Sequence, residues 1–445
     1  MKTTGKKLLL SFALLICLSA VNVASAQYLW NDTTAFKAGE ANSGRLWGYT
    51  FGDFAYKGHS DSLNRGGSNE YTGIPQSRTT FQFRRIYLGY DYNISKKFSA
   101  ELLLAAEDDF PAGNPPSSTA ASGDELLNNK LSFYIKLANI RWKNIWKGTD
   151  LVIGQAGTPA FPGLTEKVWS YRSVERTVSD IRRTPSYDMG ASLQGTFDPA
   201  TKNFGYDLMV ANGTSAKTEN DNFKWFYGDV FGYFAHKHLV IDLYADYERL
   251  ALTPVQRSRS MIKGFIAYNS SATDKSMNPG SGFTVGVEAF INTMKNGLTA
   301  TPIDGSPAVV MTDAASAISM YVHGDIVPNK LRFFARMDFY NPMNKINNAV
   351  YKKYVNSVGN YNDDSYTSTL SNGTPTFTLA NDQTYKQVFS TVGLDFKPAP
   401  RVHFMPNIWY NSYKSQLPGE NQGHDLVYRL TFFYAFGKNY DNGGF

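Results

Sequence analysis

Large apolar or aromatic side chains recur at every second position along most of this 445-residue chain. The pattern is clearest near the C-terminus, at Leu426, Tyr428, Leu430, Phe432, Tyr434 and Phe436. Successive side chains of a β-strand point to opposite faces, so this spacing gives each strand one apolar face. A chain made almost entirely of such strands must cover those faces, either as a sandwich of two sheets or as a closed barrel.

An export signal precedes the alternating region. The chain opens with basic residues up to Lys7, continues as an apolar run from Leu8 to Val21, and reaches the small residues Ala24-Ser-Ala26. The apolar run is shorter than the roughly 20 residues that a membrane helix needs, and a small-x-small cleavage site follows it. We therefore expect residues 1–26 to be a signal peptide and the mature protein to begin at Gln27.

The composition excludes several kinds of site. Cys17 is the only cysteine and lies within the signal, so the mature chain can form no disulfide, cysteine-ligated metal site or catalytic thiolate. Cleavage removes Lys2, Lys6 and Lys7, which lowers the formal net charge from +6 to +3. That charge is too small to indicate a nucleic-acid partner. Charged residues are 18% and aromatic residues 15% of the chain, a balance that suits a surface facing lipid.

The mature chain is expected to form one large domain, because no linker, helical periodicity or break in composition divides it. No apolar run after Val21 is long enough for a membrane helix, so a mature chain embedded in a membrane must cross it as a barrel. The sequence therefore predicts an all-β fold, a transmembrane antiparallel β-barrel of about 16 strands over residues 43–437. A periplasmic segment, 27–42, precedes it, and a tail, 438–445, follows it.

The clearest strands alternate as a barrel wall should, with apolar side chains toward lipid and polar or small ones toward the lumen. In the strand predicted from Leu239 to Glu248, for example, Asp242, Asp246 and Glu248 alternate with apolar residues and should point inward. The same rule directs the aromatic face of the first strand to lipid, at Trp47, Tyr49 and Phe51. A soluble sandwich could show the same alternation.

The connections between strands favour the barrel, because outer-membrane barrels have short turns on the periplasmic side and long loops outside. Compact turns are expected at Ser95–Lys97, Asn144–Gly148, Asp198–Asn203, His236–His238, Pro328–Lys330 and Pro398–Arg401. Long polar loops are expected at Gly58–Ser77, Glu107–Asn129, Pro159–Tyr187, Asn296–Thr312 and Asn341–Gln383. Short and long connections alternate, with one exception: Ser270–Gly282 is long but falls on the short-turn side.

The strand count is about 16, from near Ser43 to near Phe436, which is an even number as single-chain bacterial barrels require. Both termini then lie in the periplasm, and the last strand pairs with the first near Trp47 to close the barrel. A barrel of this size is too wide for wall side chains alone to fill, so an aqueous channel is expected. The predicted location is the outer membrane of a Gram-negative bacterium.

Short motifs carry a resemblance to a known family. They are Gly154-Gln-Ala-Gly-Thr-Pro-Ala-Phe161, Glu166-Lys-Val-Trp-Ser-Tyr-Arg172, Val174-Glu-Arg-Thr177 and Asp188-Met-Gly-Ala-Ser-Leu-Gln-Gly195. Together with Phe83–Gly89 and Asn212-Gly213, they resemble porins of the phosphate-selective O and P superfamily, particularly the Bacteroidetes-type members. The resemblance implies a trimeric, 16-stranded passive diffusion channel whose third outer loop folds inward to form the constriction. The aromatic-rich last strand also resembles the segment that the outer-membrane assembly machinery recognises, with either Phe436 or Phe445 as the terminal aromatic.

The loop Pro159–Tyr187 suits the constriction role by its own composition, since it is long, rigid and charged. Its basic residues are Lys167, Arg172, Arg176, Arg182 and Arg183, against the acids Glu166, Glu175 and Asp180, an excess of two positive charges. Basic groups that line a narrow channel favour the passage of anions. A second interpretation stays open: the arginines pair with these acids and hold the loop against the barrel wall.

Further charged residues are expected on the wall of the lumen. The predicted basic ones are Arg85, Lys136, Lys263, Arg332, Arg336, Lys397 and Arg429. Arg84 would either face outward near the rim or be turned inward by a bulge. Among the acids, Asp242, Asp246 and Glu248 are expected to form a wall opposite the bases. Such a mixed lumen puts phosphate specificity in doubt and suits a general pore in which opposed charges orient polar solutes.

No constellation for catalysis or metal binding stands out, and no cofactor is expected. His236 and His238 share a strand face but lie in a predicted turn, and no Gly-x-Ser-x-Gly or His-Glu-x-x-His pattern occurs. The leading interpretation is a non-enzymatic porin for small polar solutes and ions, with a modest preference for anions. The alternative is a non-conducting barrel that uses its long loops for surface binding or as a scaffold.

Overall fold

The computed structural model describes residues 41–62, 65, 71, 74–107, 132–182, 185–219, 221–252, 255–271, 282–356, 367–371, 374–377, 385–416 and 422–437. The predicted signal peptide, nearly all of the segment 27–42 and the tail 438–445 lie outside these residues.

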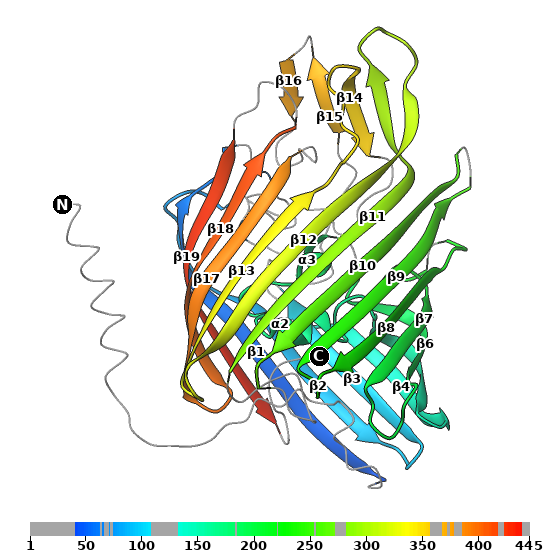
Figure 1. Cartoon of the computed structure of the whole chain (residues 1–445), viewed down its shortest axis with the longest axis vertical. Coiled ribbons are helices and arrows are strands. Elements are labelled where there is room, and N and C mark those ends of the chain that lie inside the picture. Colours follow the sequence, from blue (N-terminus) through cyan, green and yellow to red (C-terminus); the bar gives the residue numbers. More distant parts are fainter. Residues whose placement is uncertain are drawn as a thin grey trace, which may run out of the picture.

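One antiparallel sheet of 19 strands makes up almost the whole described structure. Three of its strands, β14 (Tyr351–Asn356), β15 (Thr367–Ser371) and β16 (Thr374–Phe377), lie beyond the end of the barrel (Figure 1), so 19 − 3 = 16 strands close the wall. These are β1 (Ser43–His59), β2 (Thr79–Asn93), β3 (Phe98–Glu107), β4 (Tyr134–Trp146), β5 (Thr149–Gly157), β6 (Tyr187–Thr196), β7 (Phe204–Ala211), β8 (Trp225–Phe234), β9 (Leu239–Ala251), β10 (Arg257–Asn269), β11 (Phe283–Pro302), β12 (Val309–Val327), β13 (Leu331–Asn341), β17 (Lys386–Ala399), β18 (Val402–Lys414) and β19 (Gly423–Gly437). The predicted all-β barrel of 16 strands is confirmed.

The barrel closes where the last strand pairs with the first. β19 runs antiparallel to β1 in a register that places Phe436 opposite Gly48 and Leu430 opposite Phe54. β13 pairs directly with β17, so the chain between them leaves the wall and returns to it. The closed ring leaves no exposed edge in the wall, and every wall strand has a neighbour on both sides.

Alternation along each strand separates an apolar outer face from a polar or aromatic inner face. Leu243, Ile262 and Val392 are more than half exposed on the outside. The inward positions of the same strands carry charged residues that are almost fully buried, such as Asp242 and Lys263. A belt of exposed apolar side chains on every wall strand is stable only in contact with lipid, so the strands are the membrane-spanning elements.

The first strand is the exception to the predicted orientation. Its aromatic face points into the lumen, where Trp47, Tyr49 and Phe51 pack against inward residues of β2–β4. The outward positions Gly48 and Gly52 are overlaid by rings of β19, and a β-carbon at Gly48 would overlap Phe436. The assignment of these aromatics to lipid was therefore wrong, because the missing glycine side chains make room outside for aromatic residues of the neighbouring strand.

Two of the predicted outer loops are partly strand. Asn296–Thr312 is mostly a hairpin, since β11 and β12 continue beyond the wall and pair again from Leu298 with Met311. β14 then pairs with the extended part of β11, and β15 and β16 follow, so this small sheet occupies part of Asn341–Gln383. Isolated strands of four to six residues carry too weak a pattern to be recognised in a polar sequence.

Within the residues that the structure describes, two short helices, α2 (Thr165–Trp169) and α3 (Val178–Arg182), lie in the connection between β5 and β6. Among the described residues, no helix is long and apolar enough to span a membrane.

Candidate functional site

The connection 158–186 lies within the barrel, and Figure 1 shows α2 and α3 behind the strands of the front wall. Its two ends are tied together, because the hydroxyl of Thr158 donates a hydrogen bond of 2.7 Å to the carbonyl of Pro185. Most side chains of α2 are buried, and all those of α3 are. Burial on every side of a five-residue helix requires that the barrel wall covers it, since α2 and α3 are too short to cover one another.

Apolar side chains hold the segment to one side of the wall. Trp169 is fully buried and packs against Tyr321 of β12, with ring centroids 5.1 Å apart. Tyr171 packs against Phe334 of β13 at 4.6 Å. At α3, a gap of only about 10 Å³ remains between the helix and the β13 and β17 side chains that face it. These contacts are as close as those of a protein core, so they fix the position of the segment.

Polar contacts hold the same segment to strands on both sides of the barrel closure. They join Arg84 of β2 to the Ser173 carbonyl, Lys263 of β10 to Thr165 Oγ1 (2.9 Å), Ser179 to Glu288 of β11, His323 of β12 to the Val168 carbonyl (2.9 Å), Arg336 of β13 to the Arg176 carbonyl (2.5 Å), and Trp409 of β18 to the Glu175 carboxylate (2.7 Å). The segment is therefore braced against β2, β10–β13 and β18.

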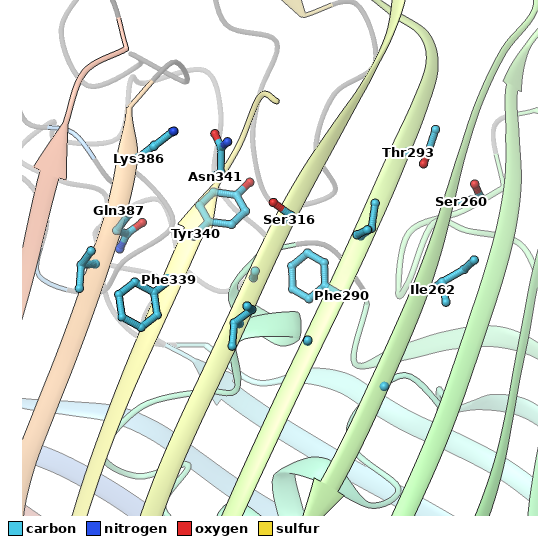
Figure 2. A pocket seen from close by; sticks show the side chains of 16 residues that line it. Ser260, Ile262, Phe290, Thr293, Ser316, Phe339, Tyr340, Asn341, Lys386 and Gln387 are labelled. Atoms are coloured by element: carbon cyan, nitrogen blue, oxygen red, sulfur yellow. The ribbon is translucent and has the colours of Figure 1, made fainter. Parts of the chain in front are cut away.

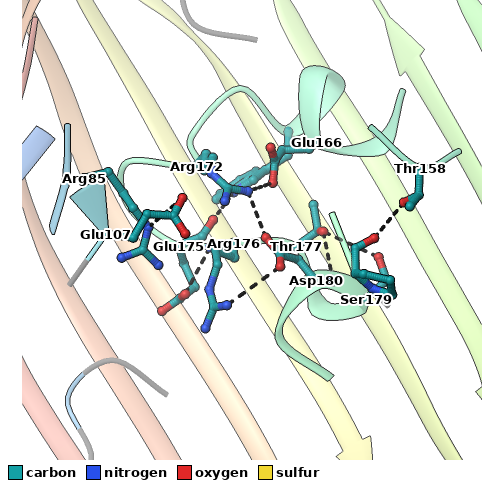
Figure 3. A network of polar contacts seen from close by, with 12 residues as sticks. Arg85, Glu107, Thr158, Glu166, Arg172, Glu175, Arg176, Thr177, Ser179 and Asp180 are labelled. Carbon is teal, nitrogen blue, oxygen red and sulfur yellow. Dashed lines mark hydrogen bonds and ion pairs between the residues drawn. The ribbon is translucent and has the colours of Figure 1, made fainter. Parts of the chain in front are cut away.

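A compact ionic network lies at the turn between α2 and α3 (Figure 3). Arg172 forms ion pairs with Glu166 and with Asp180, the second at 2.8 Å. Arg176 lies 3.7 Å from the other oxygen of Asp180 and keeps 15% side-chain exposure. Burial raises the pKa of Glu166, and the Arg172 guanidinium opposes that rise. The Arg172 guanidinium thus pairs with two carboxylates of the same loop. This fits the second interpretation, in which the loop arginines pair with the loop acids.

The wall beside this network carries a second group of paired charges. Arg85 lies 3.6 Å from Glu107, and Lys136 pairs with the same carboxylate. Arg172 also interacts electrostatically with Glu107, which links the loop to this part of the wall. Figure 3 shows the Arg85 and Glu107 side chains next to the loop arginines.

A bulge on the second strand turns Arg84 inward, the second of the two predicted alternatives. The register shifts so that Phe51 faces Arg85 while Gly52 faces Phe83, which leaves Arg84 as the extra residue. Arg84 then pairs with Asp53 of β1 at 2.6 Å, and both side chains are fully buried.

The other predicted basic residues are spread over the lumen and do not converge. Arg182 bonds to Gln387 and lies 4.5 Å from the centre of the Tyr340 ring. Arg332 pairs with Asp325 at 3.1 Å, and Arg336 with Asp338 at 2.5 Å. Lys167 is half-buried on α2, and Arg183 lies outside the described residues.

The three predicted acids on β9 all point inward, each with its own partner. Lys263 lies 3.1 Å from Asp242, and Arg259 lies 2.5 Å from Glu248. Asp246 accepts hydrogen bonds from the Tyr244 hydroxyl and the Met261 amide. Two of these acids thus pair with bases on β10 rather than with the loop arginines.

Sequence reasoning missed the wall residues that complete the network. Glu107 was assigned to a loop although it ends β3, and Asp53 was not singled out, because its strand was placed in the opposite orientation. Trp169 and Trp409 anchor the loop but carry no sequence signal that distinguishes them from lipid-facing tryptophans. A signal for Asp53 exists: it is the only charged residue at the alternate positions that continue Trp47, Tyr49 and Phe51 up to Ala55.

Some polar side chains on the inner face of β3–β7 make none of the bracing contacts described above. Five inward polar side chains on these strands remain partly exposed, and they are Glu101, Asn139, Arg141, Gln194 and Asp207. Others on the same strands, such as Glu107 and Lys136, are buried. Several bond to one another, as where Arg141 donates a hydrogen bond of 2.6 Å to the Gln194 side-chain oxygen. In the part of the chain that the structure describes, no three His, Cys, Asp or Glu side chains gather as a set of metal ligands.

Comparison with known proteins supports the fold. No protein-family model and no curated protein matches the sequence. Among solved structures, the outer membrane channel DcaP of Acinetobacter baumannii matches 89% of this chain over 98% of its own length, with a TM-score of 0.53 at 10% identity. An anion-selective porin from Comamonas acidovorans matches 89% of this chain over its full length, with a TM-score of 0.51 at 12% identity. OmpF of Salmonella typhi, in complex with daunomycin, matches 90% of this chain over 99% of its length, with a TM-score of 0.50 at 8% identity. The chain therefore shares the closed-barrel fold of these three proteins.

Proposed function

We propose that the protein is a porin, through which small polar solutes and ions diffuse passively across the outer membrane of a Gram-negative bacterium. The observation that carries the proposal is a closed barrel of 16 strands with the segment 158–186 braced inside its lumen. A barrel of this size encloses a space that wall side chains cannot fill. An inward segment narrows that space.

The proposed solute path runs between the braced segment and the inner face of β3–β7. Its support is the partial exposure of five polar side chains on that face, from Glu101 to Asp207, against the near-complete burial of the side chains that hold the segment. Polar groups of both signs, such as Glu101 and Arg141, can replace part of the hydration of a passing solute. The path therefore suits small hydrophilic molecules rather than one dedicated ligand.

A modest preference for anions, which would include phosphate, is the finer part of the proposal. Its support is the charge of the segment. Its described residues carry an excess of one positive charge, and Arg183 adds a second positive charge. The described bases are Lys167, Arg172, Arg176 and Arg182, and the acids are Glu166, Glu175 and Asp180. Ion pairing cancels much of the field that these bases would exert on a solute. We therefore expect the preference to be weak and to be lowered further by salt.

The partners that this proposal implies are outer-membrane lipid, the passing solutes, a homotrimer and the outer-membrane assembly machinery. The outer face of β1–β8 supports a protein contact, since its outward positions hold no charged residue and are rich in aromatic and aliphatic side chains. Crosslinking of the protein in its native membrane tests the trimer, and only monomers after crosslinking would argue against it.

Conductance of the purified mature protein in planar bilayers tests the proposed function. We expect discrete ion-permeable steps, with a current that depends linearly on voltage at low voltage. A reversal potential measured under a salt gradient then gives the sign of selectivity. A cation-selective result would remove the anion preference, whereas a complete absence of steps would remove the porin.

A non-conducting barrel for surface binding or scaffolding is the second candidate. The observation that favours it is the degree to which aromatic and charged side chains fill the lumen, with Tyr87, Phe334 and Trp409 fully buried. The strands β14–β16, beyond the wall, would supply the binding surface. Absence of conductance together with binding of a partner to the cell surface would support this candidate.

A further inference from the structure

Charged side chains occur on only one region of the outer wall. Among the outward-facing positions of the wall strands, four hold a charged residue, and they are Arg249 of β9, Lys295 of β11, Lys386 of β17 and Lys414 of β18. All four are basic and exposed, and they lie toward the end of the barrel beyond which β11 and β12 extend. The outward positions of the other wall strands hold no charged residue at all. A wall that faces hydrocarbon everywhere else thus presents a cluster of cations at one rim.

Strand register brings these cations together in two pairs. Ser258 of β10 lies between Arg249 on one side and Lys295 on the other. Lys386 is paired directly with Lys414. The two pairs flank β12 and β13 along the same rim of the barrel.

A groove in the outer face lies between the pairs and encloses about 740 Å³. The groove is deepest at Gly264 and Ala289, where the side chains are small. Apolar side chains such as Ile262 and Phe339 border it. Figure 2 shows Lys386 and Asn341 nearer the open end of the strands than Ile262 and Phe339. The groove is therefore apolar at its base and polar and basic at the rim.

We propose that this groove binds a phosphorylated lipid of the surrounding membrane, with an acyl chain over Gly264 and a phosphorylated headgroup that extends from Lys386, which lines the groove, toward Lys295. A hydrocarbon chain fits a narrow apolar groove that is open to the bilayer, and cations at the level of the headgroups attract anionic lipid. A second copy of the chain fits less well, because it would have to bring acids to these four cations. The outward positions of the described wall strands hold no Asp or Glu to do so.

Two independent sets of variants separate the charge from the groove. The charge set is the double substitution Lys295→Gln and Lys386→Gln, with Lys96→Gln and Lys217→Gln as a matched control, since these exposed lysines lie in other connections. The groove variant is Gly264→Leu, which fills the floor; a β-carbon there meets no atom closer than Leu243 Cδ2 at 4.0 Å, so the side chain has room. Its control is Ala191→Leu, on the outward face of β6. A heat-induced shift in gel mobility identifies the folded barrel in each case.

The measurement is native mass spectrometry of the full mature protein after reconstitution into phosphatidylcholine bilayers that contain diphosphoryl lipid A. The wild type should retain lipid A in preference to phosphatidylcholine, and Gly264→Leu should reduce that retention. Each cation near an anionic lipid contributes roughly a fivefold change in affinity, so the double charge variant should bind about 25-fold more weakly. Both controls should bind as the wild type does.

Equal retention of lipid A and phosphatidylcholine by the wild type would overturn the proposal. So would unchanged retention of lipid A in a folded charge or groove variant. Unchanged lipid retention combined with loss of an oligomer would instead assign this face to a second copy of the chain. The charge and groove variants alter different residues. If one of them does not fold, the other still tests the proposal.

Discussion

Arg172 is the residue on which the polar network of the proposed constriction depends. Its guanidinium meets both Glu166 and Asp180 in a site that is almost fully buried. Removing one member of a buried ion pair leaves the other charge without compensation, at a cost of about 3–5 kcal/mol. We expect Arg172→Ala to loosen the segment 158–186, to increase the fluctuation of single-channel current and to weaken any anion preference.

A control for that variant is Arg141→Ala. Arg141 is also inward and paired, but a quarter of its side chain is exposed, and a pair of that kind contributes about 0–1 kcal/mol. It should leave the current noise of the channel unchanged. If Arg172→Ala and Arg141→Ala change the current noise alike, Arg172 has no special role in holding the segment.

Glu166 gives the constriction a predictable response to acid. Burial raises its pKa above the usual value of 4.5, so Glu166 takes up a proton before ordinary carboxylates do as the pH falls. Loss of this negative charge leaves fewer carboxylates opposite Arg172, so anion preference should increase on acidification. A raised carboxyl pKa in the folded state also means that this protonation favours the folded state, so the change should come without unfolding.

Reversal potentials recorded from pH 7 down to pH 4.5 test this expectation. Glu166→Gln removes the titrating group. This variant should show the stronger anion preference over the whole pH range, and its reversal potential should depend less on pH than that of the wild type. A wild-type reversal potential that does not move over this range, or that moves toward cations, would contradict the assignment of Glu166.

The sequence alone could not predict which charged side chains pair with one another. The inward direction of Asp242 and Glu248 follows from the alternation of polar and apolar residues along the strand. The contact of Arg84 with Asp53 depends instead on a bulge, which no local sequence pattern predicts. Partners such as Glu107 and Lys136 lie on neighbouring strands and are 29 residues apart in the chain. Their pairing is decided by register, which is a property of the whole sheet.

At the scale of elements, the constriction segment behaves as a small docked unit rather than as a loop. Trp169 is its largest apolar anchor and is fully buried against β12 and β13. Replacing a buried tryptophan with alanine costs about 3–5 kcal/mol. Trp169→Ala should therefore undock α2 from the wall and raise single-channel conductance.

Trp142→Ala provides the comparison, because Trp142 is 44% exposed on the outer face. Loss of its contacts with lipid should leave conductance as in the wild type. An unchanged step size in folded Trp169→Ala would show that the docked segment does not limit the current.

Alternation predicts most elements well because each wall strand has one face in lipid. It fails for β1, where aromatic side chains also fill the lumen and glycines take the outer face. It also fails for β14–β16, which lie outside the membrane and need no apolar face. The segment 158–186 was expected as a loop because five-residue helices carry too few turns to show a helical period.

At the scale of the whole molecule, closure and strand number follow from simple constraints. A predicted export signal, the absence of an apolar run long enough for a membrane helix after it, and the alternation of short and long connections together leave little besides an even-stranded barrel. The connection Ser270–Gly282 is long on the short-turn side, as expected from the sequence. The uneven distribution of charge on the outer face, where cations occur only between β9 and β18, could not be predicted from the sequence. It depends on the register of each strand with its neighbours.

The central claim is that solutes pass through the lumen beside the segment 158–186, which sets the width of the path. The direct test replaces residues 164–182 with a short Gly-Ser linker and compares single-channel conductance in planar bilayers with that of the wild type. The account predicts discrete steps from both proteins, with larger steps and weaker charge selectivity in the shortened variant. Equal steps from the two folded proteins, or no steps from either, would contradict it.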